Sequence, residues 1–271
     1  MVVISTKGDK VLDKSLPEIG GKGLFTQELE SALINRTVDI AVHSAKDLPT
    51  SDPEGLCITA FLKRERPSDC LVSPLSNAYA SIEEVPAGFT IGTSSLRRQA
   101  QVLNLRPDLR VKSIRGNVDT RINKMLAGDA DALLLASAGI IRLGYETHND
   151  IHVEHLGEEN FLPAVGQGSV AIQCRLEDLE FFKILRDNDS HKRILAEREL
   201  LRRLEGGCSL PLGVRSYCSD ETKIFLHAKL LSPDGTKSIE AFGEGPELDS
   251  VDQILSKMDQ LQLSEIRKSI K

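Results

Sequence analysis

The chain has 271 residues, of which 40% are hydrophobic and 27% charged, a composition typical of a globular protein with two or three domains. No stretch approaches the roughly 20 apolar residues of a membrane helix, and the first residues lack the pattern of a signal peptide. The formal net charge of −6 disfavours a general nucleic-acid binder. We therefore expect a soluble cytoplasmic protein that binds neither membrane nor nucleic acid.

The first part of the chain alternates strand-like and helix-like patterns. The apolar run VVIST predicts a strand over 2–6, and the spacing of apolar residues in LFTQELESALINR predicts a helix over 24–36. Short strands are expected in DIAVHS, CITAFL and DCLVS, which are separated by polar connections. Pro67 lies among charged residues, so we expect a domain boundary there.

From Phe89 onward, strand-like and helix-like segments alternate three times. The strands are FTIGTS, LRVKSIR and DALLLA, and the helices are SLRRQAQVLNL, NVDTRINKMLAG and SAGIIRLG. Such alternation predicts a doubly wound parallel sheet and an α/β fold. Open sheets of this kind bind ligands at the carboxyl ends of their strands, so we expect the site at those ends.

The last part of the chain has a different pattern. Two charged helices are expected over about 177–204, followed by the loop EGGCSLPLG and by strands near 213–219, 222–231 and 237–243. The turn sequence SPDGTKS predicts a hairpin between the last two strands. A closing helix over 250–261 completes a small α+β unit, which we interpret as a third domain.

Positive charge is concentrated in residues 91–128, which carry a net +6 against −12 for the rest of the chain. Arginine suits bidentate recognition of carboxylate or phosphate, so this segment predicts a site for a small polyanion. For one group of basic residues we favour an ordinary solvent-exposed position: Arg106, Arg110, Lys112 and Lys124. For a second group we favour ligand binding: Arg97, Arg98, Arg115 and Arg121.

Two predicted helices begin where an anion could be held. Thr93, Ser94 and Ser95 precede the helix that contains Arg97, and Asn117 precedes the helix that contains Arg121. Free N–H groups and the helix dipole attract anions at such ends. Helix capping alone would explain one of the three hydroxyls, so both interpretations stay open.

The segment HSAKDLPT carries a Ser, a Lys and an Asp at the end of a predicted strand. Asp47 could be only a turn residue, or it could transfer a proton or stabilise a cation opposite the arginines. Lys46 could keep Asp47 ionised or bind substrate. We expect His43 to be structural.

Five cysteines without a CxxC pair indicate reduced thiols rather than a disulfide framework. Cys208 follows two glycines in a loop, where a covalent role is open to it, whereas the other four lie in apolar or strand-like surroundings. The group His148, His152, Glu154 and His155 fits no standard zinc spacing, so we expect no metal.

Six ordered blocks together identify a family: GGKGLFTQELE, DIAVHSAKDLPT, IGTSSLRRQAQ, IRGNVDTR, PAVGQG and LEGGCSLPLG. In this order and spacing the chain resembles the porphobilinogen deaminases, also called hydroxymethylbilane synthases, over nearly its whole length. The resemblance implies two lobes like those of type II periplasmic binding proteins and a small third domain. It implies domain boundaries of 1–66 with 164–186, then 67–163, then 187–271.

The resemblance also implies a transferase of heme and chlorophyll biosynthesis that acts as a monomer. Cys208 would hold a dipyrromethane cofactor through a thioether, and four porphobilinogen molecules would be condensed onto this primer with loss of ammonia, yielding hydroxymethylbilane. Asp47 would assist loss of the aminomethyl nitrogen, stabilise the azafulvenium cation and help to deprotonate the new junction. The remaining contacts to cofactor, substrate and growing chain would come from Lys22, Phe25, Ser44, Lys46, Thr93, Ser95, Arg97, Arg98, Arg115, Arg121, Arg142 and Gln167.

Compared with this family, the sequence lacks an N-terminal strand and helix before Met1. We therefore also expect reduced stability or activity, and a plastid location stays open if a transit peptide belongs to the absent segment. Two other hypotheses remain at this point: a truncated inactive homologue, and a non-catalytic anion-binding protein with the same arginine-rich site.

Overall fold

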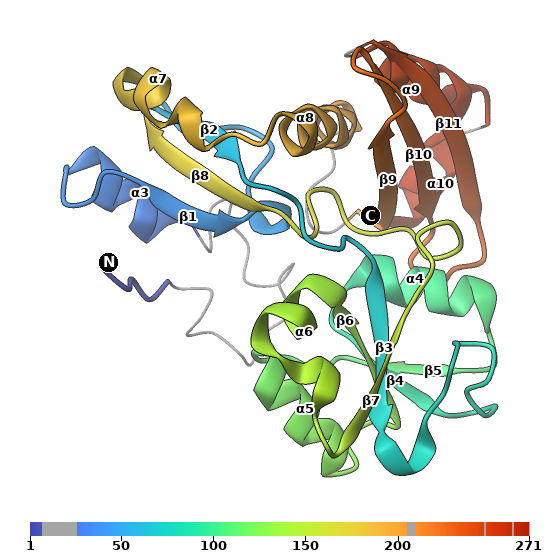
Figure 1. The fold of residues 1–271 in the computed structure, drawn as a ribbon. Helices are drawn as coiled ribbons and strands as arrows, with labels where there is room; N and C mark the ends of the chain where they lie inside the picture. The colour runs from blue at the N-terminus through green and yellow to red at the C-terminus, as the bar shows by residue number, and fades with distance from the viewer. Residues whose placement is uncertain (7–25, 205–209, 247, 262, 271) are drawn as a thin grey trace.

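The computed structural model describes residues 1–6, 26–204, 210–246, 248–261 and 263–270, and it groups the strands of these residues into three sheets. Figure 1 shows the three sheets with their helices as separate parts of the molecule. We call them the first lobe (β1, β2, β8, α3 and α7), the second lobe (β3–β7 and α4–α6) and the third lobe (β9–β11 and α8–α10). The fold is mixed α/β, as the sequence predicts, with a further small sheet unit.

The first lobe contains a three-stranded sheet in the order β1-β8-β2, with β8 antiparallel to both neighbours. Its elements are α3 (Gln27–Ile34), β1 (Ala41–Ser44), β2 (Leu56–Phe61), β8 (Val170–Arg175) and α7 (Leu179–Phe182). The strand predicted over 2–6 is wrong: these residues have no regular structure, and Val2 and Val3 are exposed. None of the three sheets of the described residues includes residues 2–6.

The second lobe is a five-stranded sheet in the order β5-β4-β6-β3-β7. Its strands are β3 (Asp69–Pro74), β4 (Thr90–Gly92), β5 (Arg110–Lys112), β6 (Ala132–Ala136) and β7 (Ile151–His155), and its helices are α4 (Leu96–Leu105), α5 (Val118–Leu126) and α6 (Ser137–Leu143). The parallel pairing is confirmed for β4 with β5 and with β6. The sequence predicts no direction for β3, which runs antiparallel to β6 and β7 because it enters the sheet from the first lobe.

The third lobe is an antiparallel sheet in the order β11-β10-β9. Its elements are α8 (Asn188–Arg203), β9 (Leu212–Cys218), β10 (Lys223–Leu231), β11 (Ser238–Pro246), α9 (Asp249–Gln260) and α10 (Leu263–Ile270). The predicted hairpin is confirmed, with Gly235 in its turn at a φ of 72°. The first of the two charged helices predicted over 177–204 is wrong: it is a series of short turns around α7, where Phe181 and Ile184 stay exposed instead of packing on a core.

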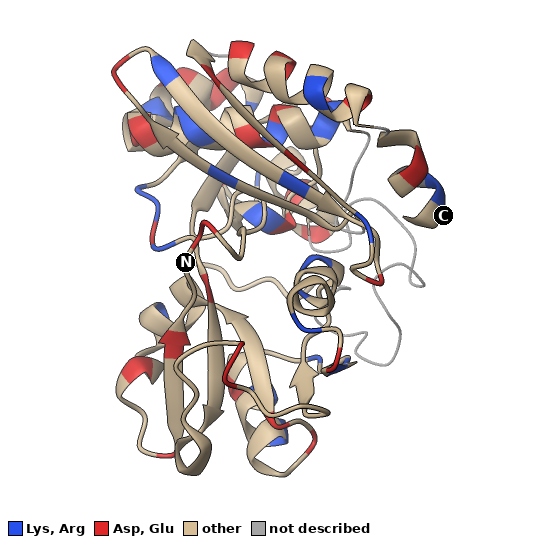
Figure 2. Cartoon of the chain, turned by 90° about the vertical axis from the view of Figure 1, so that its right-hand side faces the viewer, with Lys and Arg blue, Asp and Glu red and all other residues tan. Residues whose placement is uncertain are grey.

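Short 3-10 turns complete the secondary structure: η1 (Ala45–Asp47), η2 (Leu75–Asn77), η3 (Tyr145–Thr147), η4 (Leu176–Asp178) and η5 (Lys183–Leu185). Buried apolar residues form separate clusters in each lobe, the largest of them between the third sheet and its helices. Figure 2 shows that charged residues lie mainly on the helices and loops, while the strands of the second lobe are mostly uncharged. No described helix is long and apolar enough to cross a membrane.

Two segments of the chain join the first lobe to the second: residues 62–68 after β2, and residues 156–169 between β7 and β8. Arg64 of the first of these segments forms a buried ion pair with Glu197 of α8, with a nitrogen-to-oxygen distance of 2.5 Å. Arg64 Nε also donates to the Gln167 carbonyl at 2.8 Å, and Glu197 accepts from the Gly166 amide at 2.8 Å. This arrangement ties both connecting segments to the third lobe.

Candidate functional site

The amino end of α4 has the geometry that the sequence predicts. Ser95 is the N-cap residue, and its Oγ accepts a hydrogen bond from the Arg98 amide at 3.5 Å. Thr93 is buried, and its Oγ1 accepts from the Ser95 amide at 3.2 Å. The hydroxyls of Thr93 and Ser95 therefore order this turn, which places Arg97 and Arg98 in the first turn of the helix.

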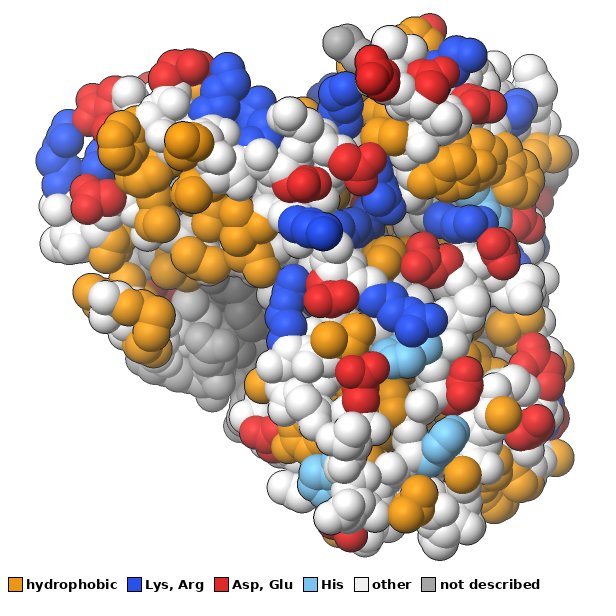
Figure 3. Space-filling view, in the orientation of Figure 1, with side chains coloured by type: hydrophobic (Ala, Val, Ile, Leu, Met, Phe, Trp, Pro, Cys, Tyr) orange, Lys and Arg blue, Asp and Glu red, His pale blue; other side chains and the backbone are white. Residues whose placement is uncertain are grey.

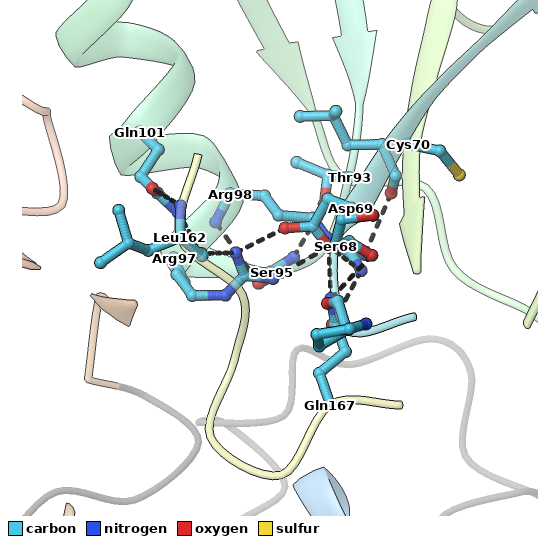
Figure 4. Close-up of polar contacts among 12 residues, drawn as sticks. Ser68, Asp69, Cys70, Thr93, Ser95, Arg97, Arg98, Gln101, Leu162 and Gln167 are labelled. Atoms are coloured by element: carbon cyan, nitrogen blue, oxygen red, sulfur yellow. Dashed lines mark hydrogen bonds and ion pairs between the residues drawn. The ribbon is translucent and has the colours of Figure 1, made fainter. Parts of the chain in front are cut away.

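Arg97 and Arg98 are buried and share one carboxylate, that of Asp69 at the start of β3 (Figure 4). Arg97 contacts both Asp69 oxygens, at 2.6 and 3.1 Å, and Arg98 Nε contacts Oδ1 at 2.9 Å. Each arginine also donates to a backbone carbonyl, Arg97 to Leu162 at 2.6 Å and Arg98 to Leu134 at 3.0 Å. Two positive charges thus meet one negative charge in this network.

Burial alone would raise the pKa of Asp69, but the charges and hydrogen bonds of Arg97 and Arg98 outweigh it and bring the pKa to about 2. The carboxylate is therefore ionised at neutral pH. Arg97 retains one unused donor, because its buried Nε has no hydrogen-bond acceptor among the described residues.

Gln167 connects this network to the two segments between the lobes (Figure 4). Its Nε2 donates to Asp69 Oδ1 at 2.9 Å and to the Pro67 carbonyl at 2.7 Å. Its Oε1 accepts from Arg98 Nη2 at 3.4 Å. Gln167 is almost completely buried, so in this structure its side chain joins the connecting segments to the arginines.

The first lobe contributes the turn η1, which follows β1 directly. The turn presents Asp47 at the surface, while Lys46 beside it is half-buried. Burial lowers the pKa of Lys46, the charge of Asp47 opposes this shift, and Arg98 adds to it. Lys46 therefore lies within electrostatic reach of both Asp47 and the second-lobe arginines.

A second pair of arginines, Arg115 and Arg121, lies at the amino end of α5. Asn117 caps the helix by accepting from the Thr120 amide at 2.8 Å, which confirms the predicted cap. Arg121 Nε donates to the Gly116 carbonyl at 2.7 Å. Burial together with the charges of Arg98 and Arg115 lowers the pKa of Arg121 to about 10, and the charge of Asp47 opposes this shift.

Arg121 of the second lobe therefore lies within electrostatic reach of Asp47 of the first lobe and of Arg98 and Arg115 of its own lobe. In Figure 3, basic side chains gather along the seam between the upper and lower parts of the molecule. Arg142 on α6 is close to the connecting segment, since its Nη2 donates to the Gly168 carbonyl at 2.9 Å. The excess of positive over negative charge here suits a carboxylate-rich ligand.

Three of the four basic residues expected at the surface are exposed. Arg110, Lys112 and Lys124 are exposed, and Lys112 pairs with Asp129 at 2.9 Å. Arg106 is half-buried and pairs with Asp108 at 2.6 Å. The expected exposure is therefore confirmed for Arg110, Lys112 and Lys124 and wrong for Arg106, which also donates to the backbone carbonyls of Ile82 and Glu83.

A cavity of about 810 Å³ lies on the other side of Asp47. It is lined by residues 1–4 and Thr6, by β1 and by neighbouring residues that include Ser44 and Asp39. No arginine of the described part of the chain lines it. Asp47 lines this cavity and lies near Arg121, whereas no described arginine lines the cavity. The arginines are therefore better placed than the cavity to hold an anion.

Three of the predicted site residues lie outside the described residues: Lys22, Phe25 and Cys208. The other four cysteines lie on strands, as predicted. His155 is engaged on both ring nitrogens, by Ser137 at 2.8 Å and Glu146 at 3.0 Å. His43 bonds to Gln173 at 3.0 Å inside the first sheet, in keeping with the structural role expected for it.

The sequence analysis does not identify two charged residues at the centre of the molecule, Asp69 and Arg64. Asp69 precedes the apolar run CLVS, and an acid at the buried start of a strand is unusual unless it is paired. That single signal could have identified Asp69 as a counter-ion. Arg64 lies in the charged run KRER and carries no comparable signal.

Comparisons with known proteins agree with the motifs. Residues 1–183 match the family model "Porphobilinogen deaminase, dipyromethane cofactor binding domain", and residues 191–256 match "Porphobilinogen deaminase, C-terminal domain". A porphobilinogen deaminase of Carboxydothermus hydrogenoformans is 46% identical over 99% of this chain and 87% of that protein. One from Halalkalibacterium halodurans is 47% identical over 86% of this chain and 74% of that protein.

Solved structures offer only distant similarity. The periplasmic aliphatic sulphonate binding protein SsuA from Escherichia coli is 12% identical, with a TM-score of 0.39, over 66% of this chain and 57% of that chain. A likeness at this level assigns no function.

Proposed function

The chain belongs to the porphobilinogen deaminase family, and from this membership we propose that it condenses four porphobilinogen molecules head to tail into hydroxymethylbilane, releasing one ammonia at each step. The observation that carries the proposal is the position of Asp47 within electrostatic reach of Lys46 and Arg121, both of which lie within reach of Arg98. An acid next to a cluster of arginines can act on a cationic centre within a polycarboxylate.

The first family domain is described as the one that binds the dipyrromethane cofactor, so we asked whether the residues present fit this group. Dipyrromethane carries acetate and propionate side chains, and these need cationic partners. The second lobe supplies them: the buried Arg97 Nε lacks an acceptor among the described residues, and Arg121 is held among other positive charges. The arginines therefore fit the cofactor's carboxylates.

When bound through Cys208, the cofactor would supply the pyrrole end that receives the first substrate. Arg97, Arg98, Arg115 and Arg121 would hold carboxylates and thereby fix the position of the rings. Arg142 and Gln167 would contact the cofactor and the growing chain from the side of the connecting segments. Thr93 and Ser95 would contact them from the turn before α4.

Asp47 would act on the substrate's aminomethyl group. As a carboxylate it would hold the ammonium group as ammonia departs, stabilise the azafulvenium cation left behind, and then accept the proton lost from the pyrrole carbon at the new junction. Lys46 next to it would contact the cofactor, and Ser44 would lie beside the entering ring. We assign Lys22 and Phe25 to the substrate side on the family motif alone.

We further propose that the chain is organised as domains 1–66 with 164–186, 67–163 and 187–271. The pairing of β8 with β1 and β2 supports the discontinuous first domain, because it unites two stretches of chain in one sheet. From the family resemblance we also propose that the chain acts as a monomer.

The test is the rate of porphobilinogen consumption by the purified chain, compared with two Asp→Asn variants. Asp47→Asn should lower the turnover by at least about 100-fold, because it removes the group that accepts the proton. Asp39→Asn is the matched control, since Asp39 lines the same cavity but pairs with Arg175 at 3.1 Å. It should leave the turnover near that of the unaltered chain. An Asp47→Asn variant that folds and turns over at the unaltered rate would refute the assignment.

A further inference from the structure

Two cysteines of the first lobe face each other across neighbouring strands. Cys57 on β2 is the direct partner of Cys174 on β8 in an antiparallel pair, and their sulfur atoms lie 3.9 Å apart. Opposed residues in such a pair have Cβ atoms about 4.5–5.5 Å apart, and a disulfide needs about 3.5–4.5 Å. A small shift of the strands with rotation of both side chains would therefore bring the sulfurs within bonding distance.

We propose that Cys57 and Cys174 form a reversible disulfide when the protein meets a small organic disulfide such as oxidised glutathione. The half-exposed Cys57 attacks one sulfur of the reagent, which gives a mixed disulfide and releases a first thiol. The buried Cys174 then attacks the Cys57 sulfur and displaces the second thiol. The two protein thiols lose two electrons to the reagent's S–S bond, and their two protons end on the released thiols.

The surroundings of the pair determine how fast this exchange occurs. Burial, together with the nearby Cys174, raises the pKa of Cys57 to about 12, so little thiolate exists at neutral pH. Exchange is therefore slow, and the redox test has to reach equilibrium rather than follow a brief exposure.

The position of the pair gives the bond a structural effect. Cys57 and Cys174 are 117 positions apart in sequence, and the whole second lobe lies between them. β2 leads into the first connecting segment, and β8 follows the second. Cys57 lies near the start of β2 and Cys174 near the end of β8, so a disulfide would join the two strands at the ends away from the connecting segments. It would restrict the unfolded chain over a long loop.

Other described cysteines offer no such pairing. Cys70 contacts the Leu135 carbonyl at 3.6 Å, and Cys218 lies near Asp189 on α8. Cys218 is half-exposed like Cys57 and lies on a strand of another lobe, so Cys218→Ser is the matched control for Cys57→Ser.

The experiment equilibrates the folded full-length chain in mixtures of reduced and oxidised glutathione, blocks the remaining thiols, and maps tryptic peptides without reduction. We expect peptides 47–63 and 143–175 to appear as one linked species, two hydrogens lighter than their sum. The linked species should disappear in Cys57→Ser and in Cys57→Ala, and it should persist in Cys218→Ser. The thermal unfolding midpoint of the oxidised chain should rise by roughly 5 °C or more and return on reduction.

Complete alkylation of both Cys57 and Cys174 after equilibration in excess oxidised glutathione would overturn the proposal. Linkage of Cys57 to a cysteine other than Cys174 would also overturn it. Neither outcome depends on the turnover of porphobilinogen, so the disulfide and the proposed function can fail independently.

Discussion

Replacing Asp69 by Asn removes the one carboxylate that two buried arginines share. Asp69 is completely buried, and it accepts hydrogen bonds from Arg97, Arg98 and Gln167. Removing one partner of a buried ion pair costs about 3–5 kcal/mol, because it leaves the other charge uncompensated. We expect a loss near the upper end of that range, since two guanidinium groups lose their counter-ion here, and this is a large part of the roughly 5–15 kcal/mol that stabilises a domain.

The assay is urea unfolding at neutral pH, followed by far-UV circular dichroism. Asp129→Asn serves as the control, because Asp129 makes an exposed pair with Lys112 and the loss of such a pair should change the stability very little. If Asp69→Asn cost no more than Asp129→Asn, the central role given to the Asp69 network would be refuted.

The pH dependence of the stability difference between the unaltered chain and Asp69→Asn gives a second measurement. The pKa of Asp69 is lowered from 3.8 to about 2, so its contribution is fully present above 3.8 and is lost as the pH falls through 2. Such a shift corresponds to roughly 2–3 kcal/mol in the free energy of unfolding. The stability difference between the unaltered chain and Asp69→Asn should therefore stay constant above about pH 5 and shrink in more acidic solution.

Two smaller changes test the backbone geometry near the site. In Gly168→Ala the new Cβ would lie 2.4 Å from the Glu65 carbonyl oxygen at a φ of +88°, whereas Gly128→Ala, at +91°, meets no atom within 4 Å. Gly168→Ala should therefore cost at least about 2 kcal/mol more in urea unfolding, and equal costs would contradict the close approach of the two connecting segments. Asn117→Ala should cost about 1 kcal/mol by removing the cap on the Thr120 amide, and no measurable loss would argue against that cap.

Local patterns predict much of this fold. The caps Ser95 and Asn117 and the hairpin turn at Gly235 depend on a few neighbouring residues, so the sequence indicates them directly. The antiparallel direction of β3 depends instead on where the chain enters the second sheet, and no local pattern records that. β7 and α10 were not predicted, because both are short and mix apolar with charged residues.

For the site, the sequence indicates the residue types better than their partners. The charge of 91–128 indicates a cluster of arginines, and pKa shifts place Asp47 near it. The sequence can mark Asp69 as a buried acid, but it does not indicate that the partners are Arg97 and Arg98, since Asp69 is 28 positions away from Arg97 and lies on β3 rather than on α4. Contacts between distant segments depend on tertiary packing.

The most direct test of the proposed function is the intact mass of the chain before and after addition of porphobilinogen. The account predicts that the purified protein is heavier than its 29.7 kDa sequence by one dipyrromethane, and that the mass then rises in equal steps, each one porphobilinogen less ammonia. Cys208→Ser should lack the initial increment, and Asp47→Asn should retain it without the later steps. A folded chain that has the unmodified sequence mass and gains nothing from porphobilinogen would contradict the account.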